Sequence, residues 1–125
     1  MGEKTSDLLL TAVSAAEDKK ATETVVLDLK DLSTVTDYFI ICSGRSDTNV
    51  KAIAEGIEEK LKQSGQRPFG VEGRREGTWI LMDYVDFVIH VFHHEKRESL
   101  ALEELWKVAR RVPLPSKAPA AKEGV

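Results

Sequence analysis

The chain has 125 residues, of which 42% are hydrophobic and 31% charged, and its formal net charge is −3 at pH 7. This length fits one domain that can bury a core without a metal or disulfides, and the single cysteine, Cys42, excludes a disulfide within the chain. An acidic balance disfavours a protein that grips nucleic acid mainly through phosphates, so we expect little direct nucleic-acid binding. No apolar run reaches the ~20 residues of a membrane span, and the N-terminus lacks a signal-peptide core. We therefore expect a cytoplasmic protein with no membrane contact.

The first half of the chain predicts a helix, two strands and a second helix. Apolar residues recur with helical spacing in two stretches, and β-branched or continuously apolar stretches lie between them. The expected elements are a helix with its apolar stripe at Leu9, Ala12, Val13 and Ala16, strands over residues 24–29 and 37–42, and a helix with its stripe at Val50, Ile53, Ala54, Ile57 and Leu61. The strand over 37–42 is apolar on both faces, which suits the middle of a sheet. Ser46 or Asp47 can cap the second helix, and Gly65 can end it.

The second half predicts three more strands and a last helix. It contains a short edge strand over residues 68–71, two strands over 78–82 and 87–92 with the spacing of a hairpin, and a helix over 98–111. The order αββαβββα predicts an α/β fold in which helices flank a mixed five-stranded sheet. We expect one domain over residues 1–112 and, because Pro, Ala and Lys dominate its composition, a disordered tail over 113–125.

The hairpin divides its side chains between two faces of the sheet. If Asp83 pairs with Asp86, alternation along the strands places on one face a purely apolar set: Ile80, Met82, Phe87, Ile89 and Val91. The same register places on the other face Trp79, Leu81, Asp83, Asp86, Val88, His90 and Phe92. Two interpretations of this second set stay open: a further layer of helix covers it, or it is an exposed apolar patch that docks on a partner. The Tyr84-Val85 turn lacks the Gly or Asn of a tight turn. A one-residue slip in the pairing of the two strands, which would exchange the two faces, therefore also stays open.

A metal site is an alternative function for the histidines. His90, His93 and His94 lie at the end of one predicted strand, but three imidazoles without a matching carboxylate are weak evidence for zinc. A surface or hydrogen-bonded role is the better interpretation. Cys42 lies in an apolar strand, which favours an inert core thiol over a nucleophile.

A nucleotidyltransferase activity is the second alternative. Ser43-Gly44 followed by Asp83 and Asp86 loosely resembles the glycine-serine loop and paired acids of those enzymes. However, the two acids flank a turn, whereas the enzymes carry them at alternate positions of one strand. No other nucleotide-binding or hydrolase motif occurs, so we expect no enzymatic activity.

Residues 37–106 resemble the Iojap-related ribosomal silencing factor family, RsfS. The resemblance rests on the order and spacing of several short segments, which are specific only together. They are Thr36-Asp37-Tyr38-Phe39-Ile40-Ile41-Cys42-Ser43-Gly44, Ala52-Ile53-Ala54, Val71-Glu72-Gly73, Trp79-Ile80-Leu81-Met82-Asp83-Tyr84, Asp86-Phe87-Val88-Ile89-His90-Val91-Phe92, Arg97-Glu98 and Leu102-Glu103-Glu104-Leu105-Trp106.

The resemblance implies a fold, a partner and a mechanism. It implies a nucleotidyltransferase-like core without catalytic acids, and no cofactor or metal. It further implies binding to the large ribosomal subunit through ribosomal protein L-fourteen, steric blocking of subunit association, and repression of translation under nutrient limitation. A homodimer of the free protein is a further possibility. Carried over by position, the partner-binding residues are Trp79, Leu81, Asp83, His90, Arg97 and Glu98.

Three positions depart from the family pattern. Leu100 stands where Tyr is general, Asn49 where Gln is frequent, and Val85 where Gly is frequent. The changes at Leu100 and Val85 are expected to alter the packing of the last helix and the hairpin tip.

Overall fold

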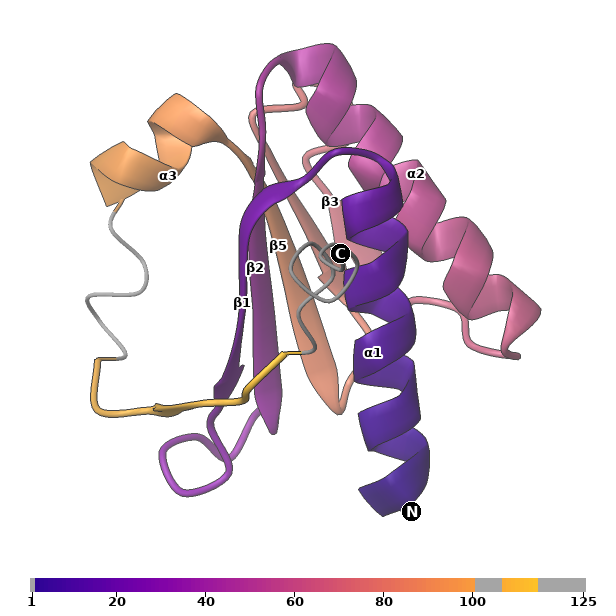
Figure 1. The fold of residues 1–125 in the computed structure, drawn as a ribbon, viewed down its shortest axis with the longest axis vertical. Coiled ribbons are helices and arrows are strands. Elements are labelled where there is room, and N and C mark those ends of the chain that lie inside the picture. Colours follow the sequence, from indigo (N-terminus) through magenta and orange to yellow (C-terminus); the bar gives the residue numbers. More distant parts are fainter. Residues whose placement is uncertain (1, 101–106, 115–125) are drawn as a thin grey trace, which may run out of the picture.

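The computed structural model describes residues 2–100 and 107–114. Three helices and six strands lie in this part of the chain (Figure 1). They are α1 Gly2–Asp18, β1 Thr22–Asp28, β2 Tyr38–Gly44, α2 Asp47–Gln63, β3 Gly70–Glu72, β4 Trp79–Asp83, β5 Phe87–His93, α3 His94–Leu100 and β6 Arg110–Arg111. The predicted α/β class is confirmed.

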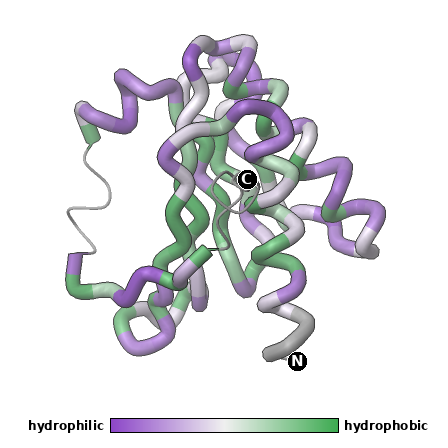
Figure 2. Tube along the Cα trace, viewed as in Figure 1, coloured by the Kyte–Doolittle hydropathy of each residue, from purple (hydrophilic) through white to green (hydrophobic). Residues whose placement is uncertain are grey.

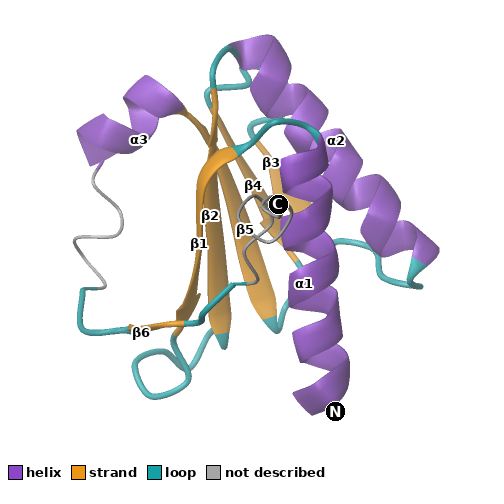
Figure 3. Ribbon diagram, in the orientation of Figure 1, coloured by secondary structure: helices purple, strands orange, loops and turns teal. Residues whose placement is uncertain are grey.

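All the strands belong to one sheet, in the order β3-β4-β5-β2-β1-β6. The central pair β2 and β5 is parallel, and the other pairs are antiparallel, so the sheet is mixed as predicted. Strand β2 lies in the interior of the sheet (Figure 3), and its residues 40–44 are buried. This position explains why the sequence there is apolar on both faces.

The end of the fold corrects two predictions. The predicted sheet has five strands, whereas the structure has six, and the predicted order αββαβββα lacks the final strand. The last helix was expected over residues 98–111, but α3 begins at His94, and residues 110–111 form β6. Residues 101–106 and the predicted tail from 115 onward lie outside the described residues. A two-residue strand has no periodicity that a sequence pattern can reveal.

Strand β6 closes the edge of β1 and carries the chain from one face of the sheet to the other. It pairs antiparallel with β1, with Arg111 opposite Leu27 and Arg110 opposite Asp28. The N–H of Val112 adds a hydrogen bond of 2.8 Å to the carbonyl of Val26. These bonds satisfy backbone groups that an open edge would leave unpaired.

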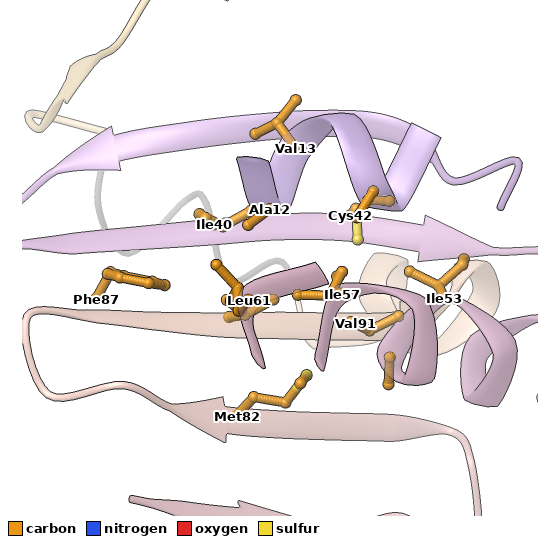
Figure 4. Packing of buried hydrophobic residues seen from close by; sticks show 14 of the residues in the cluster. Ala12, Val13, Ile40, Cys42, Ile53, Ile57, Leu61, Met82, Phe87 and Val91 are labelled. Atoms are coloured by element: carbon orange, nitrogen blue, oxygen red, sulfur yellow. The ribbon is translucent and has the colours of Figure 1, made fainter. Parts of the chain in front are cut away.

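Helices α1 and α2 pack side by side on one face of the sheet, which we call the first face (Figure 1). Figure 4 shows their side chains meeting those of β2, β4 and β5, and Ile57, Met82 and Phe87 among them are almost fully buried. Ser46 caps α2 as predicted, since its hydroxyl oxygen accepts a 3.0 Å hydrogen bond from the N–H of Asn49. The first face is therefore a closed apolar core.

The hairpin keeps its predicted faces but not its predicted register. Asp83 was expected opposite Asp86, whereas it pairs with Val88, and Trp79 pairs with Phe92 rather than His90. The two-residue loop lies one residue further along the chain, because the N–H of Tyr84 bonds to the carbonyl of Phe87 at 2.9 Å and leaves Val85 and Asp86 between them. The pairing moves by two residues, which preserves the alternation, so the two predicted sets of side chains do lie on opposite faces.

Candidate functional site

The face of the sheet opposite α1 and α2, which we call the second face, is the candidate site. Among the residues that the structure describes, α3 is the only helix on this side of the sheet, and it contacts β5 and β2 at the end of the strands and does not lie across the face (Figure 1). Its central side chains are buried: Leu27, Leu29, Ile41 and Phe92. Around them, half-buried apolar residues remain partly open to solvent: Val25, Phe39, Trp79 and Ala109. Figure 2 shows the hydrophobic colour concentrated along the strands, while α3 is largely hydrophilic.

Four rings form an aromatic cluster on the second face: Phe39, Trp79, His90 and Phe92. The indole Nε1–H of Trp79 donates a 3.1 Å hydrogen bond to Nδ1 of His90. The His90 ring lies 4.5 Å from the ring of Phe39 in an edge-to-face arrangement, and the Trp79 ring lies 5.1 Å from that of Phe92. These contacts hold the half-exposed indole in one orientation.

His90 orients this cluster as a neutral imidazole. It is only 4% exposed, and burial lowers its pKa to about 4. Because Nδ1 accepts the bond from Trp79, the neutral ring carries its proton on Nε2, which is buried and has no hydrogen-bond partner among the described residues. His90 therefore lies beneath the solvent-exposed surface of the second face and orients Trp79, whose ring is partly exposed on that surface.

The other β4 residues that the sequence singled out follow Trp79 along the strand on the same face. Leu81 lies opposite His90 in the sheet and is half-buried. Asp83 is also half-buried, and its Oδ1 accepts a 2.8 Å hydrogen bond from the N–H of Val85, which shapes the hairpin tip. Leu81 and Trp79 thus share one partly exposed apolar area, with Asp83 at its border.

Arg97 and Glu98 were expected to form pairs at the border of an interface, but the structure separates their roles. Arg97 is 6% exposed, and its Nη1 donates to the carbonyl of Glu23 at 2.7 Å and to Oγ of Ser43 at 2.9 Å. Its guanidinium therefore fastens α3 to β1 and β2. Glu98 is exposed and remains accessible.

Phe39 is a member of the aromatic cluster that the sequence argument missed. It lies on β2, whose parallel pairing with β5 places Phe39 opposite Val88 and Ile41 opposite His90. The apolar character of residues 37–42 on both faces was the available signal, but the parallel pairing itself is a long-range feature.

The geometry does not assemble either chemical alternative. The described residues contain no group of three His, Cys, Asp or Glu side chains that could hold a metal ion. Ser43-Gly44 ends β2, whereas Asp83 and Asp86 lie beside the hairpin tip, before the start of the parallel strand β5. Seven strand residues separate the two ends of β5, a distance of about 20 Å, too far for one nucleotide-sized site. Cys42 is a buried core thiol, as predicted, and burial raises its pKa to about 12.

These features define an α/β protein with a closed helical face and an apolar, aromatic second face. Comparison with known proteins agrees with this class and identifies the family. Residues 2–124 match the family model "RsfS: Ribosomal silencing factor during starvation". The chain therefore belongs to the RsfS family of ribosomal silencing factors, which are not enzymes.

Three relatives show how far the similarity extends. The ribosomal silencing factor RsfS of Halalkalibacterium halodurans is 40% identical over 108 residues, which cover 86% of this chain and 92% of that protein. A crystal structure of a protein from Chromobacterium violaceum matches with a TM-score of 0.80 and 31% identity, over 96% of this chain and 98% of that one. The mouse protein "Mitochondrial assembly of ribosomal large subunit protein 1" is 31% identical over 75% of this chain and 42% of its own length. None of the described helices is long and apolar enough to span a membrane.

Proposed function

We propose that this protein acts in the cytoplasm by binding ribosomal protein L-fourteen on the large ribosomal subunit. Bound there, it blocks association with the small subunit by steric exclusion and represses translation when nutrients are limiting. The family assignment supports silencing at the ribosome, and the name of the mouse relative supports a link to the large subunit. The second face supplies the docking surface.

The observation that carries this proposal is the half-exposed Trp79 on a sheet face that no described helix covers. Tryptophan is enriched among the residues that dominate binding energy, particularly where the ring is rigid and its surroundings exclude water. His90 and Phe92 fix the indole before any partner arrives. A preorganised ring loses little conformational entropy on binding, so more of its contact energy is available for affinity.

The charges around this area suit a basic partner. Asp83 borders it on β4, and the exposed Glu72 lies opposite Leu81 on the neighbouring strand β3. Glu98 adds an exposed carboxylate on α3. Such charges at the border of an interface speed encounter and select among partners, although each exposed pair contributes less than about 1 kcal/mol.

Steric exclusion needs bulk and affinity, without any chemical step. A folded chain of this length is about 35 Å across. Docked beside the surface where the two subunits meet, a body of that size prevents their close approach. The mechanism therefore requires only that the complex with the large subunit outlasts encounters with the small subunit.

A binding titration with purified L-fourteen tests the proposal. We expect Trp79→Ala to weaken binding by about 30-fold, corresponding to a loss of about 2 kcal/mol at a central contact. Leu10→Ala is the matched control, because Leu10 is 44% exposed on α1, on the opposite side of the sheet, and its loss should leave affinity unchanged. Equal affinity of the Trp79→Ala variant and the wild type would overturn the proposed surface. Failure of the wild type to bind L-fourteen or to inhibit subunit joining would overturn the function.

We further propose that the free protein forms a homodimer through the same face. A second copy would shield the apolar area around Trp79 and Leu81 until L-fourteen competes for it. Light scattering should then show a dimer that Trp79→Ala weakens and that excess L-fourteen converts to a one-to-one complex. A monomer at all concentrations would contradict this step and leave L-fourteen binding unaffected.

A further inference from the structure

Charge is strongly segregated along this chain. Residues 1–106 contain thirteen Lys and Arg against twenty Asp and Glu, a net charge of −7. Residues 107–125 contain five Lys and Arg against one Glu, a net charge of +4. The net charge of −3 for the whole chain is therefore the sum of an acidic part, residues 1–106, and a basic C-terminal segment, residues 107–125. This pattern points to an anionic partner for the segment.

The fold places the start of this segment on an edge of the sheet. Arg110 and Arg111 form β6, the outermost strand beside β1, and both side chains are exposed. Neither guanidinium makes a hydrogen bond or an ion pair with the described residues, whereas Arg74, in the β3–β4 loop, is neutralised by Glu58 at 2.6 Å. Two exposed guanidiniums without an acidic partner in the described part of the chain therefore lie next to each other on one edge strand.

The register decides which way each arginine points. Arg111 lies opposite Leu27, a second-face residue, so its side chain leaves the sheet on the same side as Trp79. Arg110 lies opposite Asp28 and points to the side of α1 and α2. The strands β5, β2 and β1 separate β4 from β6, which places the arginines about 19 Å from the β4 docking area at about 4.8 Å per strand.

We propose that the β6 edge binds the phosphate backbone of RNA on the large ribosomal subunit, alongside the protein contact made by Trp79. The inference rests on the proposed function, because it assumes that the second face docks on this subunit. Guanidinium groups match phosphate geometry and form paired hydrogen bonds with it. A nucleic-acid backbone offers an anion at every nucleotide, so arginines that point to opposite sides of one strand each reach a phosphate. The acidic body repels RNA elsewhere, which orients the protein with β6 toward it.

Salt-dependent binding to three ligands tests the inference: purified large subunits, isolated L-fourteen, and a short RNA duplex. The test variant is Arg110→Gln with Arg111→Gln, and the pair Arg110→Lys with Arg111→Lys retains the charge. The control is Arg67→Gln with Arg75→Gln, which removes two exposed arginines near the opposite edge of the sheet. Circular dichroism and urea unfolding verify that each variant is folded.

We expect the Gln pair on β6 to weaken binding to large subunits by about tenfold near physiological salt and to make the dependence of log K on log salt shallower by about 1.5. Its affinity for isolated L-fourteen should stay unchanged, and its affinity for the duplex should fall. The Lys pair should recover most of the binding, and the control pair should keep the wild-type salt dependence. Arg111→Gln alone should cost more than Arg110→Gln, because Arg111 points to the docked side.

Three results would overturn the inference. An unchanged affinity and salt dependence with large subunits would remove the RNA contact. An equal loss with subunits and with isolated L-fourteen would assign the edge to a protein partner. If the wild type bound no subunits, the proposed function would fail, and the RNA inference would then be decided by the duplex, where equal binding of wild type and Gln pair would refute it.

Discussion

The two faces of the sheet are built from the same strands but differ in what covers them and in where polar atoms lie. The first face meets α1 and α2, and its strand residues Ile80, Met82, Ile89 and Val91 are at most 1% exposed. The second face carries the polar atoms of Trp79 and His90 within an apolar surface, and Trp79 remains half-exposed. Stability is therefore concentrated on the first face, and under the proposed function recognition belongs to the second, so substitutions on the two faces should affect different measurements.

The largest expected effect is a loss of stability from the first face. Ile57→Ala removes a fully buried side chain between α2 and the sheet and should lower the free energy of unfolding by about 4 kcal/mol through lost burial and a cavity. Urea denaturation measures this change. At temperatures where the variant is folded, its affinity for L-fourteen should equal that of the wild type. A selective loss of affinity would show that the first face also contributes to binding.

The next effect is a pH dependence that originates on the second face. His90 has a pKa of about 4 in the folded protein against an ordinary value of 6.5, so between these values the unfolded chain binds a proton that the folded chain does not. Stability therefore falls as pH drops from about 6.5 to about 4, by an amount on the order of 3 kcal/mol, and the loss levels off below that range.

Comparison with His90→Asn isolates this contribution. Asn does not titrate, and its side-chain oxygen is placed to accept the bond from Trp79 that Nδ1 accepts in the wild type. The difference in unfolding free energy between wild type and variant should shrink as pH falls, since all other titrating groups are shared. A constant difference from pH 7 to pH 4 would show that burial does not suppress the charge of His90.

A smaller loss of stability is expected from substitutions of Arg97, which lies on α3 at one end of the sheet. Arg97→Met removes charged hydrogen bonds to Glu23 and Ser43 and should cost about 2 kcal/mol of stability. Arg97→Lys should cost nearly as much, because an ammonium on a shorter stem does not reach the position of Nη1, which donates both hydrogen bonds. Affinity for L-fourteen should persist in both variants. A loss of affinity as large as that of Trp79→Ala, with the fold intact, would show that Arg97 is part of the binding interface.

Local patterns predicted the first face well, and long-range pairings account for what they missed. Helix α2 and its buried stripe follow from spacing alone, and alternation sorted Ile80 and Trp79 onto opposite faces. In contrast, the burial of Arg97 depends on Glu23, 74 residues away in the chain, and β6 exists only because β1 offers an edge. The proposed partner-binding role of the second face was one of several interpretations of the hairpin pattern and was favoured by the family resemblance, because exposure of a sheet face depends on what the rest of the chain leaves uncovered.

The smallest predicted effect concerns the hairpin tip, which connects two strands that contribute to both faces. Val85 has φ of 73°, a left-handed conformation that costs a side chain with a branched Cβ about 1–2 kcal/mol. Val85→Gly relieves this strain but increases the entropy of the unfolded chain, so a net gain of about 0.5–1 kcal/mol is expected. Urea unfolding measures the gain, and titration with L-fourteen should show unchanged affinity, because the tip lies beyond the area around Trp79. Val85→Ala is the matched control, since it shortens the side chain without permitting positive φ. If Ala stabilised the protein as much as Gly, the exposed isopropyl group rather than the backbone would be the source of the cost, and the strain argument would fail.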